Sequence, residues 1–143
     1  MSNLNRFLKA NKIVKGNTTY VATKSLTDEN GRPLLWTIKP LTTRENDRLR
    51  DECTIQAKVT GKPNLTQPKL DTSKFIAKMI ASSVVEPNLH DKELQDSYGV
   101  MTPEDLIKEM IDNPGEYNNF AEFIQEYNGF NETLDEKVEE AKN

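Results

Sequence analysis

A polar stretch with recurring apolar residues, from Ser82 to Met101, constrains the fold more than any other part of this sequence. Pro87 stops the helical pattern that precedes it, and Thr102 with Pro103 begins a second helical pattern after it. The stretch holds too many carboxylates and amides to lie in a core. Apolar residues nevertheless recur through it, at Val85, Leu89, Leu94, Tyr98 and Val100. The sequence therefore predicts a packed connection between two helices and not a floppy linker.

Apolar stripes at helical spacing predict four helices around this connection. Their approximate bounds are 43–58, 72–85, 103–112 and 116–128. The first begins at a capping-box pattern, in which Thr42 and Glu45 each satisfy a backbone donor of the other. The helix at 72–85 has the broadest stripe, with Phe75, Ile76, Met79, Ile80, Val84 and Val85, and is expected to be the central core helix.

Two runs rich in β-forming residues precede these helices. The pair Asn30-Gly31 between them tolerates positive φ, so the sequence predicts a β-hairpin over 18–39. A two-stranded ribbon does not persist alone in water, and this one must lie on the helices or pair with another chain. By contrast, Gly61 and two prolines within 60–70 predict a loop without regular structure.

The chain of 143 residues is long enough for one core but not for two substantial ones. We expect an N-terminal arm over 1–15, a single globular domain over 16–130, and an acidic, weakly held helix over 131–143. A short amphipathic helix is predicted within the arm, at residues 3–10. The predicted fold class is α+β, mainly α, with the N-terminal β-hairpin packed on a compact bundle of four to five helices.

Charge divides the sequence into two halves. Residues 1–62 hold 12 basic and 6 acidic residues, a balance of +6, whereas residues 63–143 hold 7 and 17, a balance of -10. This division favours docking of the halves on each other or head-to-tail self-association into a homo-oligomer, and two solvated faces explain it equally well.

The acidic half would repel phosphates, and the basic residues do not cluster, so we expect no nucleic-acid partner. No apolar run approaches the roughly 18 residues of a membrane span, so no membrane partner is expected either.

The residues that carry catalysis or bind metals are scarce. The chain has one histidine, His90, and one cysteine, Cys53, whereas zinc sites need several such residues at short spacing. Its six glycines stand singly, so no phosphate-binding loop is present. We expect Cys53 to serve as a small hydrophobic residue and His90 to lie at the surface between helices. The sequence predicts no catalytic residue, cofactor or metal.

An aromatic and aliphatic stripe runs along one face of the predicted helix at 116–128. It supports two hypotheses, core packing and a face that receives a partner helix, because apolar anchors at helical spacing serve both. The candidate partner-binding residues are Tyr98, Tyr117, Phe120, Phe123, Ile124 and Tyr127.

Several blocks, in order along nearly the whole chain, resemble one known family. They are Asp28-Glu29-Asn30-Gly31 with Trp36-Thr37-Ile38-Lys39, Leu49-Arg50-Asp51-Glu52-Cys53-Thr54, Ala81-Ser82-Ser83-Val84-Val85-Glu86-Pro87, Leu94-Gln95-Asp96-Ser97-Tyr98-Gly99-Val100-Met101, and Pro114-Gly115-Glu116-Tyr117 with Asn128-Gly129-Phe130 and Glu139-Glu140-Ala141-Lys142-Asn143. The chain is similar in these blocks to the phage tail assembly chaperones of the PBSX-prophage-like class of Bacillus.

This resemblance implies a protein that is not an enzyme. Chaperones of the class bind the long, helical, apolar tape measure protein and deliver it to polymerising tail tube subunits. It further implies a location in the cytoplasm of the bacterial host and absence from the mature virion. The alternative is a structural tail or head-completion component that stays in the particle, and mass spectrometry of purified virions distinguishes the two. A small enzyme is the third hypothesis.

Overall fold

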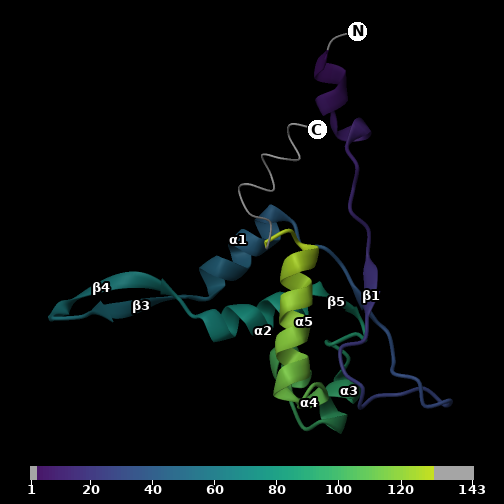
Figure 1. The fold of residues 1–143 in the computed structure, drawn as a ribbon. Helices are drawn as coiled ribbons and strands as arrows, with labels where there is room; N and C mark the ends of the chain where they lie inside the picture. The colour runs from purple at the N-terminus through teal and green to yellow at the C-terminus, as the bar shows by residue number, and fades with distance from the viewer. Residues whose placement is uncertain (1–2, 131–143) are drawn as a thin grey trace.

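Five α-helices and two small antiparallel sheets make up residues 3–130, the part of the chain that the computed structural model describes (Figure 1). The strands are β1 (Thr18–Tyr20), β2 (Trp36–Ile38), β3 (Thr54–Val59), β4 (Lys62–Leu70) and β5 (Val84–Glu86). The α-helices are α1 (Thr43–Glu52), α2 (Thr72–Ser83), α3 (Lys92–Ser97), α4 (Pro103–Met110) and α5 (Pro114–Tyr127). This is the predicted α+β class. The acidic helix expected over 131–143 lies outside the described residues.

The first sheet joins strands from distant parts of the chain, in the order β1-β2-β5. Strands β1 and β2 form the predicted antiparallel hairpin, and its turn is closed by hydrogen bonds between Asp28 and Arg32, with Gly31 at a φ of 78°. Strand β5 pairs antiparallel with the other edge of β2. The third strand that stabilises the ribbon thus comes from the same chain, directly after α2, and not from a partner.

The second sheet corrects two predictions. Helix α1 ends at Glu52 instead of continuing to residue 58, and the rest of that segment forms β3. Residues 60–70, predicted to be an irregular loop, supply the turn at Gly61 and the strand β4. Prolines are compatible with such a strand because each strand of a two-stranded ribbon has one unpaired edge. The resulting β3–β4 ribbon projects away from the helices (Figure 1).

Four other helix bounds differ from the prediction, including the end of α5 at Tyr127, one residue before the expected one. Helix α2 ends at Ser83, because the β-branched Val84 and its neighbour extend into β5. Helix α4 ends at Met110. Helix α5 begins at Pro114, since the Asn113 side chain caps it by accepting a hydrogen bond from the Glu116 amide at 2.9 Å. The sequence Asn113-Pro114 therefore starts a helix as well as ending the previous one.

Helix α2 is the central core helix, as predicted. It buries Phe75, Met79 and Ile80 and lies against α1, α4 and α5. At its surface the Lys78 ammonium forms ion pairs with Glu52 of α1, at 3.5 Å, and with Glu104 of α4, at 3.7 Å. The same helix thus holds its neighbours through buried apolar contacts and through a shared cation.

The connection after β5 is packed, as predicted, and it contains the short helix α3. Leu89 is buried, and Leu94, Tyr98 and Val100 pack partly buried against the core. The Gln95 side chain fastens α3 to the connection by donating a hydrogen bond to the Leu89 carbonyl at 2.9 Å. Val85 is the exception among the five predicted anchors, because its side chain is exposed.

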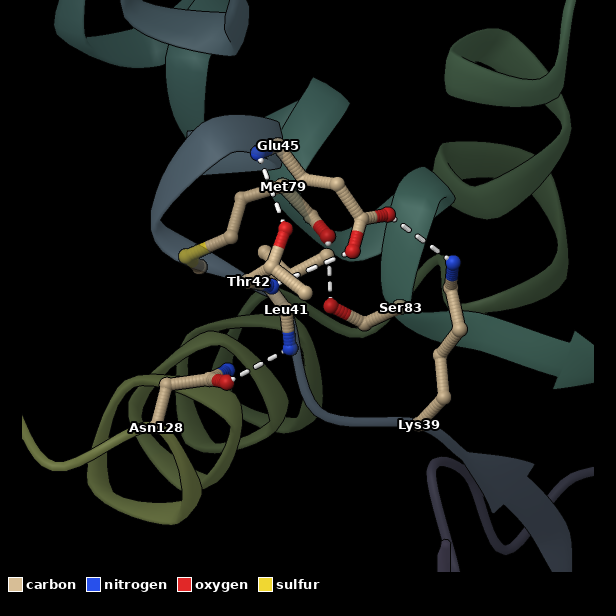
Figure 2. A network of polar contacts seen from close by, with 7 residues as sticks. All are labelled: Lys39, Leu41, Thr42, Glu45, Met79, Ser83 and Asn128. Atoms are coloured by element: carbon tan, nitrogen blue, oxygen red, sulfur yellow. Dashed lines mark hydrogen bonds and ion pairs between the residues drawn. The ribbon is translucent and has the colours of Figure 1, made fainter. Parts of the chain in front are cut away.

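Figure 2 shows how the entry to α1 is fixed between α2 and the end of α5. The predicted capping box is present: the Glu45 amide donates to Thr42 Oγ1, and the Thr42 amide donates to Glu45 Oε1, each at 3.1 Å. The Lys39 ammonium donates to Glu45 Oε2 at 3.0 Å. This bond and the one from the Thr42 amide lower the pKa of the Glu45 carboxyl.

Asn128 closes the same network from the end of α5. Its Oδ1 accepts a hydrogen bond from the Leu41 amide at 2.8 Å, and its Nδ2 donates to the Ile124 carbonyl at 2.8 Å. Replacement by alanine leaves the part-buried Leu41 N–H without this acceptor, so we expect Asn128→Ala to lower the free energy of unfolding by about 1–3 kcal/mol. Urea denaturation measures this loss of stability. The exposed Asn119→Ala on the same helix is the control, and equal stability of the two variants would contradict the role of Asn128.

Candidate functional site

An apolar cleft of about 310 Å³ lies between the β1–β2 hairpin loop and the connection that contains α3. It is lined by Leu26, Leu34, Leu35, Trp36, Glu86, Pro87, Leu94, Tyr98 and Met110. Only one of these residues, Glu86, is charged. A concave surface with mostly apolar walls is the usual form of a site that receives apolar groups.

The hairpin wall of the cleft follows from three consecutive apolar residues, Leu34, Leu35 and Trp36. Successive side chains of an extended segment point to opposite sides, so the three cannot all face the core. Trp36 is buried, whereas Leu35 is 63% exposed. A hydrogen bond of 2.9 Å from the Leu34 amide to the Leu26 carbonyl closes the loop. Leu26 and Leu34 therefore lie together on this wall of the cleft.

The opposite wall consists of residues that follow β5. Pro87 comes directly after the strand, Leu94 and Tyr98 lie on and after α3, and Met110 ends α4. A shallow, open groove adjoins this wall and shares Leu94 with it. That groove is lined by Asn88, Asp91, Glu93, Leu94 and Ser97. The apolar cleft therefore has an acidic border on the side of α3.

The six predicted partner-binding residues do not form one surface. Tyr98 lines the cleft. Phe120 and Ile124 are completely buried in the core, as the core-packing hypothesis predicts. Tyr117, Phe123 and Tyr127 are partly buried. Burial also raises the pKa of the Tyr117 hydroxyl.

Two of the partly buried aromatic residues of α5, Phe123 and Tyr127, contact the start of the chain. Phe123 stacks on Tyr20 of β1, with ring centroids 4.2 Å apart, and on Tyr127, at 6.1 Å. The Lys15 ammonium lies over the Tyr127 ring, 4.1 Å from its centroid, and donates a hydrogen bond to the Tyr127 carbonyl. The Tyr127 hydroxyl in turn donates to the Gly16 carbonyl. These contacts fix the base of the N-terminal arm against the end of α5.

The two residues considered for chemistry are placed as the sequence predicts. Cys53 is completely buried at the end of α1, and this burial raises the pKa of its thiol, which opposes formation of the reactive thiolate. His90 lies exposed in the connection. Within residues 3–130 no group of three or more histidine, cysteine or acidic side chains is arranged to hold a metal ion. None of the helices in the described range is long and apolar enough to cross a membrane.

Sequence reasoning missed most of the cleft. Its signal was the run Leu34-Leu35-Trp36, which places more apolar residues in succession than one face of a strand can bury. The position of Pro87 and Met110 beside that run had no local signal, because it depends on the pairing of β5 with β2.

Comparison with known proteins places the whole chain in one group. A family model described as the phage XkdN-like tail assembly chaperone protein matches residues 4–142. The chain is 32% identical over 120 residues to the phage-like element PBSX protein XkdN of Bacillus subtilis (strain 168), a match that covers 84% of this chain and 80% of XkdN. YqbN of the same strain is also 32% identical over 120 residues, covering 84% of this chain and 79% of YqbN. The crystal structure of YqbN superposes with a TM-score of 0.74 at 25% identity, covering 92% of this chain and 99% of that one.

Proposed function

Because the chain belongs to the phage XkdN-like tail assembly chaperone family, which is a non-enzymatic class, we propose that it binds and solubilises the tape measure protein and promotes assembly of the tail tube. It acts in the cytoplasm of the bacterial host and leaves the client before the tail is complete. The observation that carries this proposal is the apolar cleft between the hairpin loop and α3.

The chemistry of the cleft suits a helical apolar client. An amphipathic helix presents apolar side chains on one face, and such side chains enter grooves of this kind. Leu35 lies at the exposed edge of the cleft, where contact with a client removes its side chain from water. Complete burial of one leucine side chain contributes about 1.5–3 kcal/mol. A cleft of about 310 Å³ holds only a few such side chains, which favours binding that can later be reversed.

Co-expression with the tape measure protein tests the proposal. The unmodified chain is expected to keep the client in the soluble fraction of a lysate, and Leu35→Asp is expected to reduce the soluble client roughly tenfold, since a buried carboxylate without a partner is strongly unfavourable. Leu65→Asp is the matched control, because Leu65 has a similar exposure, 53%, on the distant β3–β4 ribbon.

Both variants change exposed side chains, and circular dichroism with thermal melting verifies that each remains folded. Loss of soluble client with Leu35→Asp alone supports the cleft as the binding site. Equal solubilisation by the two variants would remove the cleft from the mechanism, and a client that stays insoluble with the unmodified chain would overturn the proposed function itself.

A further inference from the structure

The N-terminal arm exposes apolar side chains that the rest of the described chain does not bury. The described part of the arm, residues 3–15, is exposed throughout, and the predicted amphipathic helix is replaced by two short 3-10 helices, Asn3–Phe7 and Lys9–Asn11, without a buried residue. Phe7 is 83% exposed, Ile13 94% and Val14 82%. Large apolar side chains concentrated in one short segment are typical of a surface that another molecule covers.

The charge of the arm matches the surroundings of the cleft. The arm, residues 1–15, contains Arg6, Lys9, Lys12 and Lys15 and no acidic residue. The cleft contains Glu86, and the groove that adjoins it contains Asp91 and Glu93. A segment that carries both apolar and basic side chains therefore meets apolar walls and an acidic border of opposite charge, which favours their association.

The arm leaves the domain at the end that lies away from its own cleft. Lys15 and Gly16 are held at the C-terminal end of α5 through Tyr127, and from there the arm runs outward, whereas α3 and α4 lie at the opposite end of α5 (Figure 1). Contact with its own cleft would require the arm to turn back along the whole domain. The cleft of a second copy is open to it without such a reversal.

We propose that the N-terminal arm of one copy occupies the apolar cleft of a second copy, with its basic side chains over the acidic border formed with α3. The arm and the tape measure protein then compete for one cleft, so self-association covers the cleft when no client is present. The arm contact itself needs only the arm, the cleft and a second copy of the chain, whereas the competition with the client rests on the proposed function.

Disulfide trapping between two single variants tests the arm contact. A mixture of Phe7→Cys and Leu35→Cys proteins, oxidised without any client, forms a mixed disulfide only if the arm of one copy meets the cleft of the other. The native Cys53 is buried and does not compete. Phe7→Cys mixed with Leu65→Cys is the control for random collisions, and mass spectrometry of the linked peptides quantifies both products. We expect at least tenfold more of the first product than of the second.

Equal yields from the two mixtures would overturn the proposal. So would an internal disulfide in the double variant Phe7→Cys/Leu35→Cys that leaves the protein monomeric, because the arm would then lie on its own cleft. Sedimentation velocity supplies a second measurement. The triple variant Arg6→Glu/Lys9→Glu/Lys12→Glu is expected to raise the dissociation constant of self-association at least tenfold, and an unchanged constant would contradict the charge match. Neither experiment contains the tape measure protein, so failure here leaves the co-expression result intact.

Discussion

The variant Phe120→Ala is expected to lose about 3–5 kcal/mol of the free energy of unfolding. Phe120 is completely buried on α5, and its ring joins this helix to the first sheet. It stacks on Tyr20 of β1, with ring centroids 5.5 Å apart, and makes a T-shaped contact with Trp36 of β2, with centroids 5.8 Å apart. Truncation to alanine removes both ring contacts and leaves a cavity in the core.

Urea denaturation followed by circular dichroism measures this loss. Phe130→Ala is the matched control, because its ring is about half exposed beyond the end of α5 and the same change should alter stability by less than about 0.5 kcal/mol. Similar stabilities of the two variants would mean that the core position of Phe120 is wrong.

The variant Leu89→Ala is expected to lose about 2–5 kcal/mol, although Leu89 lies outside any helix or strand. Its side chain is 1% exposed and belongs to the same core as α2 and α4, so its removal creates a cavity as it would within a helix. A loop residue whose side chain did not pack would tolerate the change.

Val85→Ala is the control for Leu89, since Val85 lies in β5, just before the connection, and is 46% exposed. The two variants compared under one denaturant series show whether the connection is held by its buried anchor. A larger loss at Val85 than at Leu89 would contradict the described packing of this segment.

Features set by neighbouring residues could be predicted from the sequence. The capping box of Thr42 and Glu45, the turn at Gly31 and the start of α4 at Pro103 each depend on side chains within a few positions of the backbone groups that they satisfy. The core role of α2 also followed from local periodicity, because a broad apolar stripe has to be buried wherever its helix lies.

Features set by pairing between distant residues could not be predicted in the same way. Residues 54–59 continue the helical pattern of α1 weakly but also contain β-branched residues, and their antiparallel pairing with β4 decides for the extended form. The sequence predicts a helix up to residue 85, which includes most of β5, for the same reason. Val84 fits a helix or a strand, and its pairing with β2 makes it part of a strand.

The candidate site shows this limit most clearly. Tyr98 was predicted from its apolar side chain in a polar stretch, and it does line the cleft. Phe120 and Ile124 were predicted from the spacing of one helix, which cannot distinguish a face that meets the rest of the domain from a face that meets a partner. The cleft itself combines a hairpin loop with residues after β5, and no single segment of sequence contains it.

The β3–β4 ribbon affects the tendency of the protein to aggregate. Both outer edges of a two-stranded ribbon offer backbone groups to other extended chains, and such edges promote amyloid-like stacking. Here Pro63 and Pro68 have no N–H to offer, and Lys58, Lys62 and Lys69 repel an identical ribbon. The prolines and lysines of the ribbon thus disfavour edge-to-edge stacking between copies of this protein.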